Sequence, residues 1–331
     1  MRYHIIFLCI LTVLLTVAVA ACTPAATPMP TPVPPTATPE LATPIPPTAT
    51  PGKFPLTLTD NLGREVTLSG LPQRIVSLAP SNTEVLFAVG AGDQVVGVTQ
   101  YCNFPPEAQG REQIGGFSAK TISIEKIVDL EPDLVLAAGE IHQPVIEALD
   151  QLNILVFSID PNTLDEVYSD IELVGRLTGH EEEAAQVVAE MEDRVAAVTE
   201  RVNTIPQEDR LTVYWEVFDE PRMTAGPSTF TGQLIELAGG VNIFGDVSED
   251  YPQISDEEVI GRDPAVIMGA DTMGDKLTTE LVAQRPGWDQ IEAVQKARIY
   301  LFDGDMVARA GPRLAQVLEV MAEALYPELF E

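Results

Sequence analysis

The chain has 331 residues, 45% of them hydrophobic, and 50 acidic against 19 basic side chains give it a formal net charge of −31. That excess of negative charge opposes binding to nucleic acids and to anionic lipid surfaces. Histidine and cysteine number only three each. A tight zinc or manganese site normally recruits several imidazoles or thiolates, so we expect no metal site and no resident cofactor.

The first 22 residues have the pattern of an exported protein. Arg2 supplies a positive charge, an apolar run covers residues 5–19, and alanines precede Cys22. This is the shape of a secretory signal peptide over residues 1–21, and the cysteine after it resembles the lipobox of bacterial lipoproteins. The resemblance implies a lipid on Cys22 and a location on the extracytoplasmic face of the cell membrane. A transmembrane anchor is the alternative, but about 15 to 17 apolar residues are short of the roughly 20 that one needs.

Residues 22–53 are dominated by Thr, Pro and Ala and predict a tether. Proline fixes φ and lacks an N–H donor, so such repeats favour extended polyproline II and cannot pack a core. At about 3.1 Å per residue, some 30 residues could reach on the order of 90 Å. We expect a globular part held near the membrane, although an inert spacer fits the composition equally well. With Cys22 lipidated, Cys102 is the remaining mature thiol, so no internal disulfide is expected.

From residue 54 short apolar runs alternate with helical stretches, which predicts an α/β lobe over residues 54–163. After a hairpin at 54–68, the predicted elements are strands at 74–78, 95–98, 134–137 and 155–159 and helices at 83–89, 124–130 and 145–152. Gly90 and Gly92 lie between a helix and a strand. We interpret them as a turn, because a dinucleotide fingerprint needs a third glycine where Val95 stands.

Residues 164–205 are predicted to be helical and to connect two lobes. Apolar residues recur at helical spacing from Leu164 to Leu177 and from Val187 to Val202, with a break near Gly179. The second helix, of roughly 22 residues, would span about 33 Å, which is longer than one lobe needs. A coiled-coil dimer is the alternative, but the apolar face is too short for sustained heptads, so we expect a monomer.

The alternation resumes after Pro206 and predicts a second α/β lobe over residues 206–331. Its predicted elements are strands at 211–217, 266–268 and 299–302 and helices at 231–237, 256–260, 278–283 and 312–325. The expected fold is therefore α/β, with two Rossmann-like lobes joined by one long α-helix and a ligand cleft between the lobes.

Candidate ligand contacts lie in loops after predicted strands, where α/β sheets bind ligands. These loops bring aromatic, small and a few polar residues to one edge, and they are 79–82, 100–106, 115–117, 226–229, 250–252 and 305–313. Catalysis is not indicated, because Gly-x-Ser-x-Gly is absent and Cys102 has no nearby histidine in sequence. In a chain with so many carboxylates, general acid–base catalysis can never be excluded. An extracellular hydrolase or a structural surface protein is therefore kept as the alternative to a binding protein.

Several of these segments together resemble a known family. RIVSLAPSNTEVLFAVGAGDQVVGVTQYCNFPPEA, SIEKIVDLEPDLVLA (123–137), AGGVNIFGDVSEDYPQISDEEVI (238–260) and RAGPR (309–313) are similar to the helical-backbone (class III) substrate-binding proteins of ABC importers. The likeness covers nearly all of residues 55–331 and is greatest to the cobalamin-binding members. It implies two lobes that close little around a long helix, with the cargo held between them. It also implies a partner, an ABC permease dimer with a cytoplasmic ATPase.

By motif position, the resemblance implies a set of ligand contacts. Tyr101, Phe117 and Tyr251 would stack on the flat corrin face and edges. Asp305 and Arg309 would supply polar contacts from the second lobe.

The cargo itself stays open at this point. In cobalamin binders tryptophans stand at the positions of Phe117 and Tyr251, which leaves haem or a ferric siderophore as the alternative. Tyr101 or His142 could then be an iron ligand. Scarce Arg and Lys in the loops disfavour a strongly anionic siderophore.

Two glutamates match the family's docking carboxylates, one in each lobe: Glu125 in Ser-Ile-Glu-Lys and Glu257 in Ser-Asp-Glu-Glu. In the family each meets arginines on one half of the permease. Exposed charge pairs steer and orient partners while adding little net affinity. A solvated carboxylate in a first helical turn is the simpler alternative. The expected function is a lipid-anchored receptor that captures a corrinoid and delivers it to a permease. The tether would raise the effective concentration of the receptor at the permease.

Overall fold

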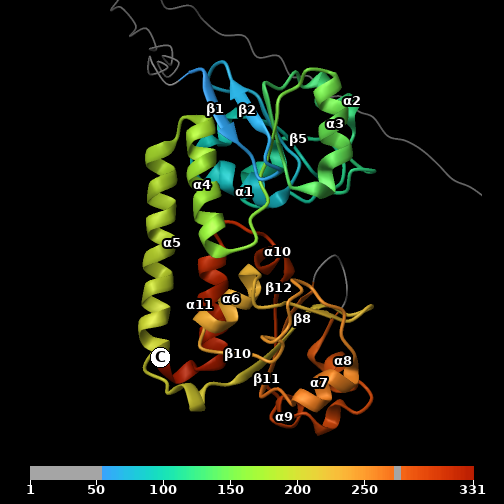
Figure 1. The fold of residues 1–331 in the computed structure, drawn as a ribbon, viewed down its shortest axis with the longest axis vertical. Coiled ribbons are helices and arrows are strands. Elements are labelled where there is room, and N and C mark those ends of the chain that lie inside the picture. The colour runs from blue at the N-terminus through green and yellow to red at the C-terminus, as the bar shows by residue number, and fades with distance from the viewer. Residues whose placement is uncertain (1–53, 272–276) are drawn as a thin grey trace, which may run out of the picture. The chain divides into compact units, whose positions relative to one another are not determined.

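The computed structural model describes residues 54–271 and 277–331. The signal peptide, Cys22 and the tether lie outside the described residues. The described chain forms two α/β lobes joined by a long helix (Figure 1), so the predicted fold class is confirmed. None of the helices in these residues is long and apolar enough to cross a membrane.

The amino-terminal lobe is built on a parallel sheet in the order β5-β4-β3-β6-β7. Its strands are β3 (Ile75–Ser77), β4 (Val95–Val98), β5 (Glu112–Gln113), β6 (Leu134–Ala137) and β7 (Val156–Ser158). Its helices are α1 (Pro80–Ala88), α2 (Ile124–Asp129) and α3 (Gln143–Gln151). Strands β3, β6 and β7 are buried at every residue, as in a parallel sheet covered on both faces. The predicted hairpin precedes them as antiparallel β1 (Leu56–Thr59) and β2 (Glu65–Leu68).

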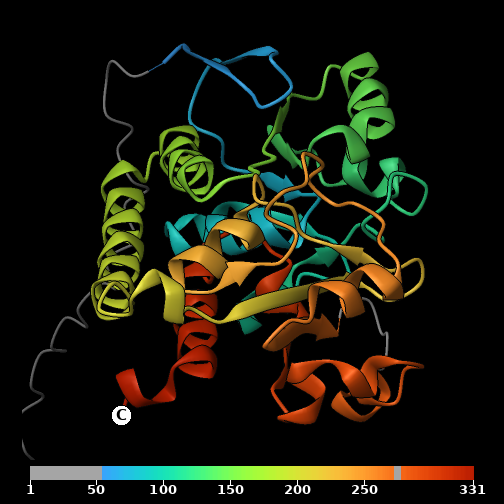
Figure 2. The same ribbon diagram turned by 60° about the horizontal axis from the view of Figure 1, so that its bottom comes forward.

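Two helices follow, and the predicted break between them is confirmed. Helix α4 (Leu164–Thr178) begins with a capping box at Thr163 and ends at Gly179, whose φ of +79° is in the left-handed region that glycine adopts readily. Helix α5 (Glu181–Val202) has 22 residues. It packs against α1 of the amino-terminal lobe and against α6 (Phe230–Leu237) and α11 (Leu314–Leu325) of the carboxy-terminal lobe (Figures 1 and 2). It is therefore the predicted connector.

The carboxy-terminal lobe has a parallel sheet in the order β10-β8-β11-β12, with β9 antiparallel to β8. Its strands are β8 (Thr212–Phe218), β9 (Met223–Thr224), β10 (Val241–Asn242), β11 (Val266–Asp271) and β12 (Ile299–Asp303). Besides α6 and α11, its helices are α7 (Asp256–Arg262), α8 (Thr279–Ala283), α9 (Glu292–Gln295) and α10 (Gly304–Val307). The sequence did not predict β5, β9, β10, α9 or α10. The missed strands have two residues and the missed helices have four, about one helical turn, so neither shows a repeat of apolar spacing.

One apolar core runs through both lobes and the connecting helices. It includes Leu86 of α1, Val174 of α4, Met191 of α5, Val213 of β8 and Leu318 of α11. Two smaller clusters cover the other faces of the sheets, one in each lobe. Separating the lobes would expose part of the shared core to water, and this cost opposes large changes in their spacing.

Candidate functional site

Loops from the two lobes meet where they follow the carboxyl ends of the strands. Asn103, after β4, donates from Nδ2 to Asp305 Oδ2, after β12, at 2.5 Å. At a second point the backbone N–H of Leu164 donates to Gln233 Oε1 of α6 at 3.0 Å. The edge that the sequence predicted for a ligand is therefore also the place where the lobes touch.

A group of charged and polar side chains around one buried carboxylate, which we call the interlobe ion cluster, joins the lobes. Its members are Glu84, Asn103, Asp305, Arg309 and Arg313. Glu84 of α1 is only 3% exposed, and its carboxylate accepts two hydrogen bonds from the Arg313 guanidinium, at 2.7 and 2.6 Å. Arg309 Nη1 donates to Glu84 Oε1 at 2.9 Å. A buried carboxylate is tolerated because two guanidiniums surround it.

The structure places Arg309 in this cluster rather than in open solvent. It is 7% exposed, and besides Glu84 it contacts Asn103 Oδ1 at 2.8 Å, the Tyr101 carbonyl oxygen at 3.1 Å and Asp305 Oδ1 at 2.8 Å. The predicted contacts Tyr101, Asp305 and Arg309 thus lie together. The Asp305 side chain keeps half of its surface accessible.

Sequence reasoning did not single out Glu84 as a site residue. The available signal is a lone carboxylate in α1 that directly precedes the apolar residues Val85 and Leu86. Charged side chains are almost never fully buried unless they are paired, so such a residue points to a cation elsewhere in the fold.

The predicted aromatics are only partly covered. The exposed fractions of Tyr101 and Tyr251 are 51% and 39%. Partial burial, with Asp250 and Asp160 nearby, raises the pKa of Tyr251 to about 12, so its phenol stays neutral. Asp160 follows β7 of the amino-terminal lobe, and its charge acts on Tyr251 of the other lobe. The two residues therefore lie close to each other across the junction.

Phe117 rests on the edge of His142, with the ring centroids 5.2 Å apart. His142 is fully buried, and its Nδ1 accepts from the Ala138 N–H at 2.9 Å. Its Nε2 therefore carries the proton and donates to the Phe117 carbonyl oxygen at 2.7 Å. Burial lowers the pKa of His142 and keeps the ring neutral. Both ring nitrogens are therefore engaged within the lobe, and His142 could act as an iron ligand only by breaking one of these bonds.

Cys102 is also buried. Its Sγ lies 3.1 Å from Thr83 Oγ1 and 3.2 Å from Thr99 Oγ1. Burial raises the pKa of its thiol, so it stays protonated. Among the residues that the structure describes, no group of three or more His, Cys, Asp or Glu is arranged to hold a metal ion.

The two predicted docking carboxylates occupy equivalent local positions. Glu125 and Glu257 are each the second residue of a short helix, α2 and α7, and both are exposed. A serine caps each helix: Ser123 Oγ accepts from the Lys126 N–H at 3.3 Å and Ser255 Oγ accepts from the Glu258 N–H at 3.2 Å. Neither glutamate pairs with a cation in the described part of the chain.

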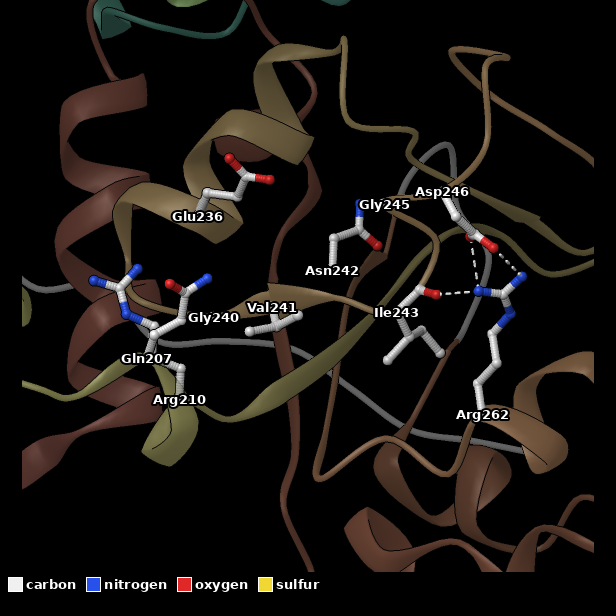
Figure 3. A pocket seen from close by; sticks show the side chains of 10 residues that line it. All are labelled: Gln207, Arg210, Glu236, Gly240, Val241, Asn242, Ile243, Gly245, Asp246 and Arg262. Carbon is white, nitrogen blue, oxygen red and sulfur yellow. Dashed lines mark hydrogen bonds and ion pairs between the residues drawn. The ribbon is translucent and has the colours of Figure 1, made fainter.

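Pockets lie beside this region and away from it. One of about 340 Å³ adjoins the interlobe ion cluster and is lined from both lobes by Glu84, Phe87, Ala88, Phe104, Pro105, Glu107, Pro312 and Arg313. A polar one of about 630 Å³ lies in the carboxy-terminal lobe beside β10 (Figure 3). There Arg262 faces Asp246 at 2.7 Å, with Arg210 and Glu236 on the opposite side. No predicted site residue lines this second pocket, so it is separate from the candidate site.

The chain matches a known family over most of its length. The family model for periplasmic binding proteins matches residues 75–306. The match includes all five predicted ligand contacts except Arg309, which lies just beyond it, and both predicted docking glutamates.

Similar proteins span the same length. The chain is 35% identical over 283 residues to YvrC of Bacillus subtilis, an ABC transporter substrate-binding lipoprotein, covering 84% of this chain and 88% of that one. It is 34% identical over 281 residues to a cobalamin-binding protein of Halobacterium salinarum, covering 82% and 74%. Among solved structures, the periplasmic haem-binding protein RhuT of Roseiflexus has a TM-score of 0.69 at 27% identity, covering 78% and 99%. This chain is a member of the periplasmic binding protein family.

Proposed function

We propose that this protein is a lipid-anchored, extracytoplasmic solute-binding protein of an ABC importer, which captures a cobalamin-type corrinoid and delivers it to the permease. The observation that carries the proposal is the half-exposed Tyr101 at the junction of the lobes, next to Asp305, in a chain 34% identical to a cobalamin-binding protein. A flat macrocycle with amide side chains suits such a surface, because rings stack on the aromatic and amides bond to the carboxylate.

Arg309 can join the ligand only by leaving some of its present partners. Arg313 holds Glu84 through two bonds of its own, so Arg309 can turn toward a ligand without leaving that buried carboxylate unpaired. The cost of the exchange is then a hydrogen-bond rearrangement rather than an orphaned charge. Tyr101, Phe117, Tyr251, Asp305 and Arg309 are proposed on this basis as ligand contacts.

Calorimetric titration of the full chain in detergent with cyanocobalamin tests the cargo. We expect one site and a loss of affinity of about fivefold for Tyr101→Ala, since a ring contact contributes roughly 1 kcal/mol. Leu152→Ala is a matched control, because Leu152 is exposed to the same 51% and is not a proposed contact. No heat at tens of micromolar protein would overturn the corrinoid proposal.

Haem is the second candidate, and the likeness to RhuT favours it. With His142 buried, Tyr101 is the remaining candidate iron ligand of the two that the sequence suggested. A Soret band in protein purified from its own host, shifted by Tyr101→Phe, would favour haem over a corrinoid.

Docking and anchoring have their own test in the host. Charge reversal at Glu125 or Glu257 should lower cyanocobalamin uptake severalfold, while binding by the purified protein is unchanged. Cys22→Ser should release the protein from the membrane fraction. Uptake that is indifferent to both glutamates would contradict the docking proposal.

A further inference from the structure

One segment of the carboxy-terminal lobe, residues 250–257, carries both Tyr251 and Glu257. Three backbone bonds attach this 250–257 segment to the β8–β9 hairpin and the turn after it. The Gly226 N–H donates to the Asp250 carbonyl oxygen at 2.7 Å, the Thr224 N–H to Pro252 at 3.2 Å, and the Ile254 N–H to the carbonyl oxygen of Arg222 at 3.0 Å. The backbone on both sides of Tyr251 is therefore fixed to the hairpin.

Arg222 also holds the other end of the segment through its side chain. Its Nε donates to Asp256 Oδ1 at 2.6 Å. Asp256 is the first residue of α7 and directly precedes Glu257. A single residue thus bonds through its carbonyl oxygen near Tyr251 and through its guanidinium next to Glu257.

The guanidinium of Arg222 is itself held in place from below. Its Nη1 contacts Glu216 Oε2 at 3.1 Å and Asp219 Oδ1 at 2.9 Å, and its plane lies over Trp288 with 5.1 Å to the ring centroid. Glu216 is buried at 2% exposure. Turning Arg222 away would weaken the pairing of a buried carboxylate, which is costly, so the side chain has one favoured position.

Arg285 occupies the other side of the same arrangement. It bonds Glu216 twice, at 2.6 and 2.7 Å, and lies over Trp288 at 4.6 Å. Its side-chain exposure, 10%, is close to the 13% of Arg222. In the described part of the chain it makes no hydrogen bond or ion pair to the 250–257 segment. Arg222 and Arg285 therefore both contact Glu216 and Trp288, and they differ in that only Arg222 bonds Asp256.

We propose that Arg222 is a positioning residue that fixes Tyr251 and Glu257 as one body, so that the ligand-facing and permease-facing ends of the 250–257 segment move together. The proposal rests on the proposed function, which assigns those two roles. The buried contacts of Arg222 would then position the 250–257 segment as well as stabilise the lobe. A bound ligand that immobilises Tyr251 also immobilises the first turn of α7.

Amide hydrogen exchange of the full chain, read by mass spectrometry over residues 250–262, tests this. Without ligand, Arg222→Gln should speed exchange in the first turn of α7 by about tenfold, as expected for the loss of a charge-assisted bond. Arg285→Gln should leave that turn within about twofold of the wild type. Asp256→Asn should reproduce Arg222→Gln, and the double variant should add nothing further.

A second arm uses cyanocobalamin at saturation. In the wild type and Arg285→Gln, the ligand should slow exchange around Tyr251 and in the first turn of α7. In Arg222→Gln the ligand should slow amide exchange around Tyr251 but not in the first turn of α7. Equal effects of Arg222→Gln and Arg285→Gln in the ligand-free arm, or unchanged transmission in Arg222→Gln, would overturn the proposal. If cyanocobalamin does not bind the wild type, the corrinoid proposal fails, while the ligand-free arm still decides the positioning role.

Discussion

The two lobes present a proposed docking carboxylate in the same local way but support it differently. In each, an aromatic residue, Phe117 or Tyr251, precedes a serine-capped short helix whose second residue is the glutamate. Serine caps and acidic first turns stabilise both helix starts. The local geometry thus repeats because the same short-range rules act twice.

The support behind each helix differs. In the amino-terminal lobe, backbone bonds hold the segment, such as Ser123 N–H to the Ile114 carbonyl oxygen at 2.8 Å. Lys126 adds a bond to the Gln113 carbonyl oxygen at 2.7 Å and a 3.4 Å pair with Glu112, both on exposed side chains. The carboxy-terminal lobe also holds its segment by backbone bonds, but its side-chain support is Arg222, whose side chain is only 13% exposed and bonds Asp256. The comparison indicates a fixed carboxy-terminal docking glutamate and a more adjustable amino-terminal one.

The largest expected effect comes from removing the buried carboxylate under α7. Glu216→Ala leaves Arg222 and Arg285 without their shared partner, so we expect a loss of about 3–5 kcal/mol in the free energy of unfolding. Glu112→Ala, the corresponding cut in the amino-terminal lobe, should cost less than about 1 kcal/mol because the pair is exposed. Urea unfolding measures both, and similar costs for the two variants would break the comparison.

The connecting helix α4 holds a different kind of buried carboxylate, one that pairs with no cation in the described part of the chain. Asp170 is 6% exposed, and its Oδ2 accepts from the Asn61 amide Nδ2 at 3.3 Å. Burial, together with nearby Glu166 and Asp160, raises the pKa of Asp170 to about 7. The folded state therefore holds the proton more tightly than the unfolded chain does. Stability is lost as pH rises from about 4, the usual carboxyl pKa, to about 7.

Replacing Asp170 removes that pH dependence. Relative to the wild type, Asp170→Asn should gain on the order of 2–4 kcal/mol between pH 4 and pH 8, since each unit of pKa difference corresponds to about 1.4 kcal/mol. Glu172→Gln, on the exposed face of the same helix, is the control and should show no such gain. Urea unfolding at several pH values measures this, and a gain that does not grow with pH would contradict the assignment.

A smaller effect is expected at the two aromatics themselves. Tyr251→Ala and Phe117→Ala should each weaken cyanocobalamin binding by about five- to tenfold, as for the loss of one ring contact. Tyr251→Phe should bind as the wild type does, because the ring supplies the proposed contact. Titration calorimetry reads all three, and a large loss in Tyr251→Phe would assign the contact to the hydroxyl.

Periodicity predicted most of the fold. The longer helices, most strands, the break at Gly179 and the connector follow from the spacing of apolar residues, which can be read from the sequence. Strand β10 could not be predicted in this way. Its two residues, Val241 and Asn242, are defined by pairing with β8, a partner far away in sequence.

The site was predicted less completely, for the same reason. The loops and the helices that carry Glu125 and Glu257 could be located, the helices from apolar spacing and the two glutamates from the family resemblance. The partners of Arg309 could not be, because Glu84 lies more than 200 positions away and meets it only after the lobes assemble. The inward roles of His142 and Arg222 likewise depend on burial, which a single sequence does not state.

The smallest expected effect is at Lys126, the exposed support of the amino-terminal docking helix. Lys126→Ala removes the bond to Gln113 and the pair with Glu112, and should cost at most about 0.5 kcal/mol, as exposed pairs do. Exchange in the first turn of α2 should rise by less than about threefold, against about tenfold for α7 in Arg222→Gln. A tenfold rise in α2 would mean that one surface lysine positions Glu125 as firmly as Arg222 positions Glu257. The two lobes would then hold their docking carboxylates equally, and only the burial of the support would distinguish them.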